Sequence, residues 1–290
     1  MAQAPDMRRA PWLNVALAAV VAALGAWVYF KPARDTPAEF PLSVLKPSEA
    51  KSIRVERPGE PPILIEKQAG SWRVTAPFAA RGDDLRVQRL LEIVEAKTAH
   101  KLPATDLARF ELERPQASVI IDGQAFAFGM VGAVAREQYV LTRGSVYTVH
   151  PRYGTALPAS AGELASRHLL APGEAPVRIE LKDFTVEQRD GKWTLSTGTG
   201  GLSQDDLIRW IEDWRLAGAT RVEPGVKGKT LAEIRIRLKD GGALTLGMLA
   251  REPELVLARP DEKLQYHFRP EIAKRLLFPP AAAQERAAKK

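Results

Sequence analysis

The sequence contains no cysteine among its 290 residues, and this absence removes several kinds of site. Disulfide bonds, thiolate metal sites and cysteine nucleophiles are all excluded. A chain without cysteine is indifferent to redox compartment, so a location outside the cytoplasm is compatible with it. Histidine is also scarce, and the four that occur are His100, His150, His168 and His267. None lies two or four residues from another, so the sequence predicts no metal site.

The familiar motifs of catalysis and nucleotide binding are missing as well. The sequence has no Gly-x-Ser-x-Gly, no Ser-x-x-Lys with its companion motifs and no G-x-x-x-x-G-K-[ST]. The glycine-rich stretch STGTGG at 196–201 follows an expected hairpin without the βαβ crossover of a dinucleotide site, so it is interpreted as a connector. We therefore expect no catalytic residue, no cofactor and no cofactor-binding residue. An enzyme would have to rely on Asp and Glu alone.

Charge of one sign is nowhere concentrated, although the chain carries a net charge of +7. Residues 52–170 hold 15 Lys and Arg against 13 Asp and Glu, and residues 177–280 hold 18 against 16. A protein that binds nucleic acid gathers its basic residues on one face or arm. The diffuse excess therefore predicts a solvated surface and no nucleic-acid partner.

One long hydrophobic run is present near the N-terminus. From Trp12 to Phe30 the chain reads WLNVALAAVVAALGAWVYF, without a charged residue. About 20 helical residues cross the hydrocarbon core of a bilayer, and aromatic residues at both ends suit its interfaces. The run predicts a transmembrane helix over residues 12–30, through which the protein contacts the lipid bilayer. A cleaved signal peptide is the alternative, but its apolar segment is shorter and is followed by small residues.

The flanks of this run predict an orientation. Two arginines precede it closely, whereas the basic residues that follow it stand among acidic ones. The positive-inside rule then favours a cytoplasmic tail over residues 1–11 and a periplasmic body, in a single-pass protein of the bacterial inner membrane. Residues 31–51 contain four prolines and predict an extended stalk. Residues 281–290 predict a flexible basic tail.

The body contains landmarks that occur twice in the same order. Trp72 and Trp193 are 121 residues apart, and Asp84 and Asp206 are 122 apart. Three further pairs continue the order at spacings of 118 or 119: Gly129 with Gly247, Tyr147 with Tyr266, and Pro151 with Pro270. Ordered landmarks at nearly constant spacing indicate an internal duplication. We expect a first repeat over residues 52–170 and a second over 177–280.

Hydrophobic periodicity within each repeat predicts a hairpin, then a helix, then a run of short strands. Apolar residues at i, i+3, i+4 and i+7 predict an amphipathic helix within 81–99 and another within 202–220. Alternation of apolar and polar residues predicts four strands over 117–150 and four over 232–268. Consecutive strands favour antiparallel sheets. The expected class is α+β, with each repeat an antiparallel sheet packed with one long amphipathic helix.

Two pairs of neighbouring carboxylates stand at expected helix starts: Asp83 with Asp84, and Asp205 with Asp206. Adjacent carboxylates can bind a cation or act as acid and base. Negative side chains at a helix start also cap its free N–H groups. Because Ser203 with Asp206 resembles a capping box, capping is the preferred interpretation.

Trp210 and Trp214 lie one helical turn apart in the second repeat. If exposed, they could form a surface that stacks on a sugar or contacts a partner. They share an apolar stripe with Leu207 and Ile211, which predicts packing in the core.

Several short motifs resemble those of a known family. The N-terminal apolar run is followed by GSWRVTAP at 70–77, an Asp-Asp-Leu helix start, and FELERP at 110–115 before the hairpin IIDGQA. This combination resembles bacterial envelope proteins that carry domain of unknown function 4340. The resemblance covers most of 52–170 and part of the pattern in 177–280, which lacks the FELERP element. Such proteins are often found with ABC transporters of the gliding-motility auxiliary type, so the resemblance implies an accessory role without catalysis.

We therefore expect a non-enzymatic, membrane-anchored accessory protein of the envelope, whose extracytoplasmic repeats bind a protein partner such as an ABC transporter complex. The alternative is a periplasmic binding module for a cell-envelope glycan or lipid. Exposed Trp210 and Trp214 would favour that alternative.

Overall fold

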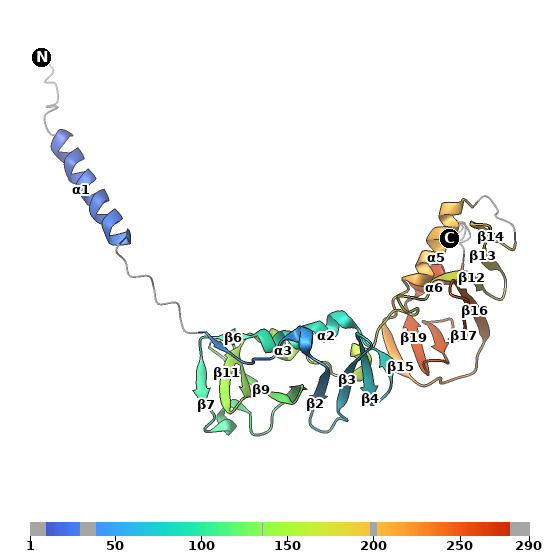
Figure 1. Ribbon diagram of the computed structural model, residues 1–290, viewed down its shortest axis with the longest axis horizontal. Helices are drawn as coiled ribbons and strands as arrows, with labels where there is room; N and C mark the ends of the chain where they lie inside the picture. Colours follow the sequence, from blue (N-terminus) through green and yellow to red (C-terminus); the bar gives the residue numbers. More distant parts are fainter. Residues whose placement is uncertain (1–9, 30–38, 135, 198–201, 279–290) are drawn as a thin grey trace, which may run out of the picture. The chain divides into compact units, whose positions relative to one another are not determined.

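The computed structural model of the protein describes residues 10–29, 39–134, 136–197 and 202–278 (Figure 1). The chain divides into two compact units, Met1–Phe40 and Pro41–Lys290. Three features expected from the sequence lie wholly or largely outside the described residues. They are the cytoplasmic tail, the basic tail at 281–290 and the glycines of the connector at 198–201.

Within the described residues, the first unit holds helix α1 (Ala10–Tyr29). The expected transmembrane helix over residues 12–30 is not found, because none of the described residues forms a helix long and apolar enough to cross a bilayer. A crossing needs about 20 continuous apolar residues. Phe30, the last residue of the expected span, lies outside the described part of the chain. Within the described residues, this finding contradicts the prediction of a transmembrane helix.

The first large sheet of the second unit has nine antiparallel strands in the order β5-β4-β3-β2-β8-β9-β10-β11-β7 (Figure 1). These strands are β2 (Ser52–Glu56), β3 (Ile63–Gln68), β4 (Ser71–Ala76), β5 (Ala80–Arg81), β7 (Lys101–Pro103), β8 (Ala117–Ile121), β9 (Gln124–Val131), β10 (Gln138–Thr142) and β11 (Ser145–Val149). In β2, Ile53 and Val55 are buried while Ser52 and Arg54 are exposed. One face of the sheet therefore covers the core and the other faces water.

The second large sheet has eight antiparallel strands in the order β14-β13-β12-β16-β17-β18-β19-β15. These strands are β12 (Pro176–Glu180), β13 (Thr185–Arg189), β14 (Lys192–Leu195), β15 (Arg221–Pro224), β16 (Ala232–Leu238), β17 (Ala243–Ala250), β18 (Leu255–Arg259) and β19 (Leu264–Phe268). Apart from the additional β5, the order of strands along the chain is the same in the two sheets. A third sheet pairs β1 (Phe40–Pro41) with β6 (Lys97–Thr98).

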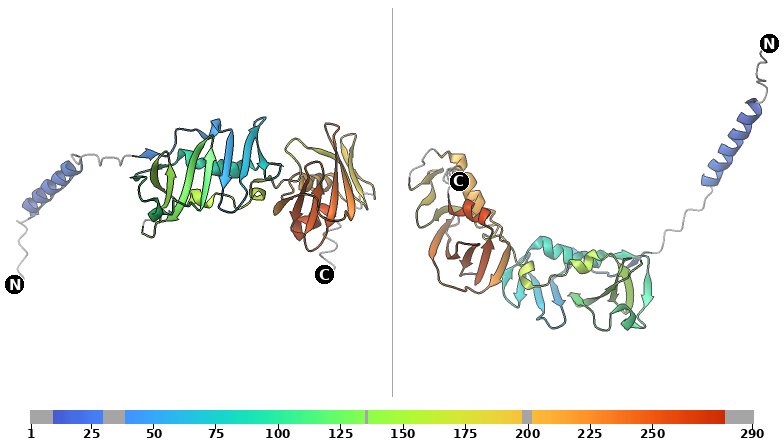
Figure 2. Two further views of the ribbon diagram at one scale, coloured as in Figure 1. Left: turned by 90° about the horizontal axis from the view of Figure 1, so that it is seen from below. Right: turned by 180° about the vertical axis from the view of Figure 1, so that it is seen from behind.

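Short helices cover one face of each large sheet (Figure 2). Those of the first sheet are α2 (Asp84–Leu91), α3 (Arg152–Thr155) and α4 (Ala161–Leu164), and those of the second are α5 (Gln204–Arg215) and α6 (Pro270–Leu277). Three single 3-10 turns are η1 (Pro47–Glu49), η2 (Glu92–Glu95) and η3 (Leu107–Phe110).

The expected fold class, α+β with one long amphipathic helix in each repeat, is wrong. The described body is mostly β-sheet, and its helices are short. The helix expected within 81–99 ends at Leu91, because the chain tightens there into η2 and then enters β6. Ile93 and Val94 are still buried in that 3-10 turn. Apolar periodicity therefore continues past the point where the α-helix ends, since the periodicity reports burial and not the type of helix.

Candidate functional site

One carboxylate of each pair singled out in the sequence takes part in capping a helix. Asp83 is the N-cap of α2, and its side chain accepts a hydrogen bond of 3.2 Å from the backbone N–H of Arg86. Ser203 and Asp206 form a capping box at the start of α5, with distances of 3.2 and 3.0 Å. Hydrogen bonds from the backbone N–H and then the hydroxyl of Ser203 lower the pKa of Asp206. The predicted capping is confirmed.

Trp210 and Trp214 are both 0% exposed, which confirms that they pack in the core. Their ring centroids are 6.1 Å apart in an edge-on arrangement. The indole N–H of Trp214 donates a hydrogen bond of 3.1 Å to the carbonyl of Leu276 in α6. Trp214 therefore holds α5 against α6, and neither tryptophan presents its ring to a sugar or a partner.

One histidine is buried within a polar cluster. His267 in β19 is 6% exposed, and its Nδ1 lies 3.0 Å from the guanidinium of Arg221 and 3.4 Å from the carboxylate of Glu254. Its Nε2 lies 3.8 Å from Glu223. In the part of the chain that the structure describes, no three His, Asp or Glu side chains gather so as to hold a metal ion.

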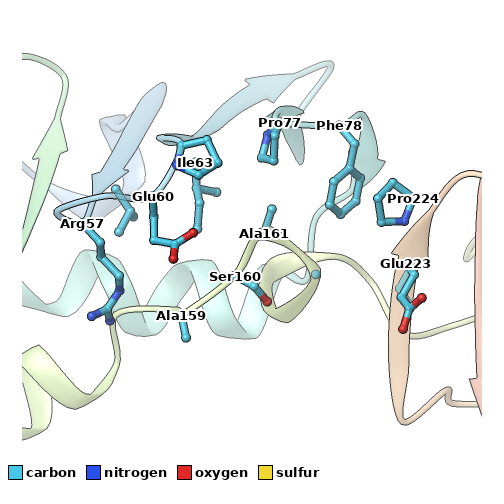
Figure 3. A pocket seen from close by; sticks show the side chains of 14 residues that line it. Arg57, Glu60, Ile63, Pro77, Phe78, Ala159, Ser160, Ala161, Glu223 and Pro224 are labelled. Carbon is cyan, nitrogen blue, oxygen red and sulfur yellow. The ribbon is translucent and has the colours of Figure 1, made fainter.

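A cavity of about 330 Å³ opens where loops of the first sheet meet strand β15 of the second (Figure 3). Its lining comes from four segments of the chain, within 55–63, 77–78, 159–162 and 222–224. Its volume is near the lower end of the range of roughly 300–1,000 Å³ for small-molecule pockets. We call it the junction cavity, and its size suits one bulky side chain or a small molecule.

The lining of the junction cavity is largely apolar. Pro77, Phe78 and Pro224 form the wall nearest to β15 (Figure 3). Proline has no backbone N–H, so Pro77 and Pro224 offer no hydrogen-bond donor to an occupant. Val55 and Ile63 are buried members of the core that also reach the cavity. These walls favour an apolar occupant.

The 159–162 segment approaches β15 very closely. A Cβ atom on Gly162 would lie 2.7 Å from the carbonyl oxygen of Val222, so only glycine permits this approach. Helix α4, which contains Gly162, is also attached to the start of α2, because the backbone N–H of Asp83 donates a hydrogen bond of 2.8 Å to Leu164. This wall of the cavity is therefore held in place by backbone contacts on both sides.

Charged groups stand at the rim of the junction cavity. Arg57 donates hydrogen bonds of 3.0 Å to the carbonyls of Pro158 and Leu157, which fix its guanidinium. Burial by itself would raise the pKa of Glu223, but hydrogen bonds from Gln265 and Arg221 outweigh it and lower that pKa. Glu223 is therefore ionised at neutral pH and occupied by its own partners, so it is poorly placed to act as a base.

Arg81, at the edge of the first sheet, connects the two halves of the body. Its Nε is 2.7 Å from the carboxylate of Glu262, and another guanidinium nitrogen lies 3.1 Å from the hydroxyl of Tyr266. The same nitrogen donates to the carbonyls of His168 and Leu169 at 2.7 and 3.2 Å. Tyr266 completes the network by donating a hydrogen bond of 2.6 Å to Glu262.

A second buried arginine anchors the segment between the two sheets. The side chain of Arg259 is 3% exposed and lies 2.5 and 2.8 Å from the two carboxylate oxygens of Glu174. It also donates a hydrogen bond of 2.7 Å to the carbonyl of Leu169. Because Arg81 and Arg259 hold the same linking segment, the two walls of the junction cavity belong to one connected structure.

Residues 72–238, more than half of the chain, match the family described as Domain of unknown function (DUF4340). The chain belongs to this family. No curated protein and no solved structure matches it. The resemblance to DUF4340 proteins seen in the sequence is thereby confirmed.

The DUF4340 region includes three of the four segments that line the junction cavity, and leaves out the segment within 55–63. Among the lining residues, Pro77 is the last residue of the motif GSWRVTAP at 70–77, and the others belong to no motif singled out in the sequence. The cavity was missed because its residues come from distant parts of the chain and most of them are ordinary apolar or small residues. The close approach of Gly162 to Val222 could not be predicted from the sequence either, since a glycine can occur in a short helix for several reasons.

Proposed function

We propose that this DUF4340 protein is a non-enzymatic accessory protein of the cell envelope, and that its junction cavity receives an apolar side chain of a protein partner. The observation that supports this proposal is the cavity of about 330 Å³ with apolar walls that backbone contacts hold in place. Its titratable lining residues are Arg57, Glu60 and Glu223. These do not make up an acid, a base and a nucleophile in contact, which favours binding over catalysis.

A single anchoring side chain could supply much of the affinity. Burying a Leu, Ile, Phe or Met side chain from water contributes about 1.5–3 kcal/mol. Residues of this kind that enter a preformed pocket dominate the energetics of many interfaces. Since the walls around Phe78 and Gly162 are already ordered, little conformational entropy would be lost on binding. The charged rim would then orient the partner.

The class of partner comes from the family resemblance. Proteins of this kind occur with ABC transporters of the gliding-motility auxiliary type, so we propose a transporter complex as the partner and the outside of the cytoplasm as the place of action. The absence of cysteine is compatible with that location. A glycan or lipid module is less well supported, because Trp210 and Trp214 are buried.

Co-purification of the full chain from its own cells in mild detergent tests the proposal. We expect a protein partner with the wild type and at least a tenfold weaker association for Phe78→Ser, because the pocket loses its aromatic wall. Ser160→Trp should also weaken association, because the larger side chain would fill the cavity. The side chain of Ser160 makes no capping hydrogen bond to α4, so the substitution removes no such bond. Leu231→Ser is the matched control, since Leu231 is 63% exposed and lies outside the lining.

Equal association for Phe78→Ser, Ser160→Trp and the wild type, with unchanged thermal melting, would contradict the proposal. Retention of a purified glycan or lipid that these substitutions abolish would favour the alternative function. Mass spectrometry of the captured partner then shows whether a transporter is present.

A further inference from the structure

A second cavity, of about 560 Å³, lies at the start of α6 and is lined by three arginines. Arg269 precedes α6, Arg275 lies in its last turn, and Arg167 comes from the segment that links the two sheets. The remaining lining includes Glu271 and the stretch 218–220. Three guanidinium groups face one carboxylate in this lining, so its net charge is positive. We call it the arginine cavity.

Arg167 supplies the observation that points to a ligand. Its Nε atom has less than 1 Å² exposed to solvent and no hydrogen-bond partner in the described structure. Buried donors in folded proteins are almost always paired, and a charged one is costly to leave without an acceptor. Arg167 as a whole is only partly buried and lines the arginine cavity, so the end of its guanidinium group can bind an acceptor that enters the cavity and compensates the charge.

The other arginines are also available to an anion. Arg167 and Arg269 form no ion pair within the residues that the structure describes, and Arg275 is 3.6 Å from Asp213 with 56% of its side chain exposed. No side chain caps the start of α6, whose first N–H groups lack partners within the helix. The positive end of the helix dipole adds to the potential of the arginines.

We propose that the arginine cavity binds a phosphate group, either free or in a lipid headgroup. Guanidinium groups bind phosphate through paired, charge-assisted hydrogen bonds, and arginines from separate elements can address different oxygens of a tetrahedral anion. A planar carboxylate, in contrast, would pair with only one guanidinium group in this way. The volume exceeds that of a single phosphate, which leaves room for the group to which it is esterified. This site is separate from the junction cavity and does not depend on the function proposed for it.

Titration calorimetry of the full chain with inorganic phosphate, at constant ionic strength set by chloride, tests the free anion. Arg167→Gln and Arg269→Gln should each weaken binding about tenfold or more, because each removes charged hydrogen bonds. Glu271→Gln should tighten binding, since it removes the one opposing carboxylate from the lining. Arg237→Gln on the exposed face of β16 changes the net charge equally and should leave binding unchanged.

Sedimentation with phosphatidylcholine vesicles, with and without phosphatidic acid, tests the lipid. Retention that requires phosphatidic acid and falls in Arg167→Gln and Arg269→Gln identifies a headgroup site. Phosphate binding that falls in these variants, without such retention, identifies a free anion. If neither phosphate nor phosphatidic acid binds, or if Arg237→Gln weakens binding as much as Arg167→Gln, the proposal is overturned. Thermal melting of each variant shows that the fold is retained.

Discussion

Arg259 is a buried charged residue that forms ion pairs with several carboxylates. Its side chain is 3% exposed, and its charge is compensated by Glu174, Asp261 and Glu262 at 2.5, 3.1 and 3.7 Å. Burying such a pair costs desolvation free energy, so the net stabilisation is modest while both partners are present. Removing Glu174 takes away the closest partner and leaves the buried guanidinium with the more distant carboxylates of Asp261 and Glu262, which is destabilising.

Glu174→Gln should therefore lower the free energy of unfolding at pH 7 by about 3 kcal/mol, as for a broken buried ion pair. Burial by itself would raise the pKa of Glu174, but the hydrogen bonds from Arg259 and from the backbone of Ala171 outweigh it and lower that pKa below its ordinary value of 4.5. Because the folded-state pKa is depressed, this contribution is present above the unfolded-state pKa and is lost as the pH falls through the folded-state pKa.

Urea denaturation between pH 7 and pH 3 measures both effects. The wild type should lose more stability than Glu174→Gln as the pH falls below about 4.5, the ordinary pKa of this carboxyl group. Glu233→Gln is the control, since the side chain of Glu233 is 57% exposed and its ion pair with Arg235 is screened by solvent. Parallel pH profiles for the wild type and Glu174→Gln would show that the pair contributes nothing.

At the scale of single elements, capping distinguishes the helices of this body. Ser203 accepts a hydrogen bond from the backbone N–H of Asp206 at the start of α5, whereas Ser160 makes no side-chain cap at the start of α4. The two serines occupy the same position relative to their helices. They therefore provide a matched pair for measuring what a cap contributes.

Ser203→Ala should lower the free energy of unfolding by about 1 kcal/mol, because a backbone N–H at the helix start loses its acceptor. Ser160→Ala should change it by no more than a few tenths of that amount, since no such hydrogen bond is lost. Chemical denaturation of the wild type and both variants measures these changes in the free energy of unfolding. Equal losses in the two would mean that the capping box contributes no stability.

Strands were the elements most visible in the sequence. In β16, Ile234, Ile236 and Leu238 are buried while the residues between them are more exposed, as the alternation predicts. The strands β8, β10 and β19 also lie within the segments that alternation predicts. Helix lengths were predicted less well, because an apolar stripe continues through α2 into the 3-10 turn η2 without change of spacing.

At the scale of the whole molecule, the two large sheets share a strand order and are connected by polar contacts. Arg81 of β5 reaches Glu262 and Tyr266 of the second sheet, and β5 has no counterpart there. Burial, followed by the negative charge of Glu262, raises the pKa of Tyr266. The phenol therefore stays neutral at physiological pH and can donate its hydrogen bond to Glu262.

Arg81→Gln should uncouple the two halves of the second unit. The substitution removes the ion pair with Glu262 and the hydrogen bonds to the carbonyls of His168 and Leu169. Buried charges that lose a partner destabilise the structure that holds them. In differential scanning calorimetry we expect a lower melting temperature, with a van't Hoff enthalpy that falls below the calorimetric enthalpy.

Arg54→Gln provides the comparison for this experiment. Arg54 is 51% exposed, and its partner Glu56 lies in the same strand, so its loss should leave one cooperative transition. A single transition with an unchanged enthalpy ratio in Arg81→Gln would show that the two sheets remain coupled without the contacts of Arg81.

The local features of this protein were predictable from its residues: the alternating strands, the capping of α2 and α5, the burial of Trp210 and Trp214, and the family. Each depends on neighbouring residues, whose periodicity and hydrogen bonding act over a few positions. Where the helices end, and which distant groups come into contact, depends on how the whole chain folds. Phe78, Gly162 and Val222 form one cavity because the chain brings three segments together, and no local pattern records such a meeting.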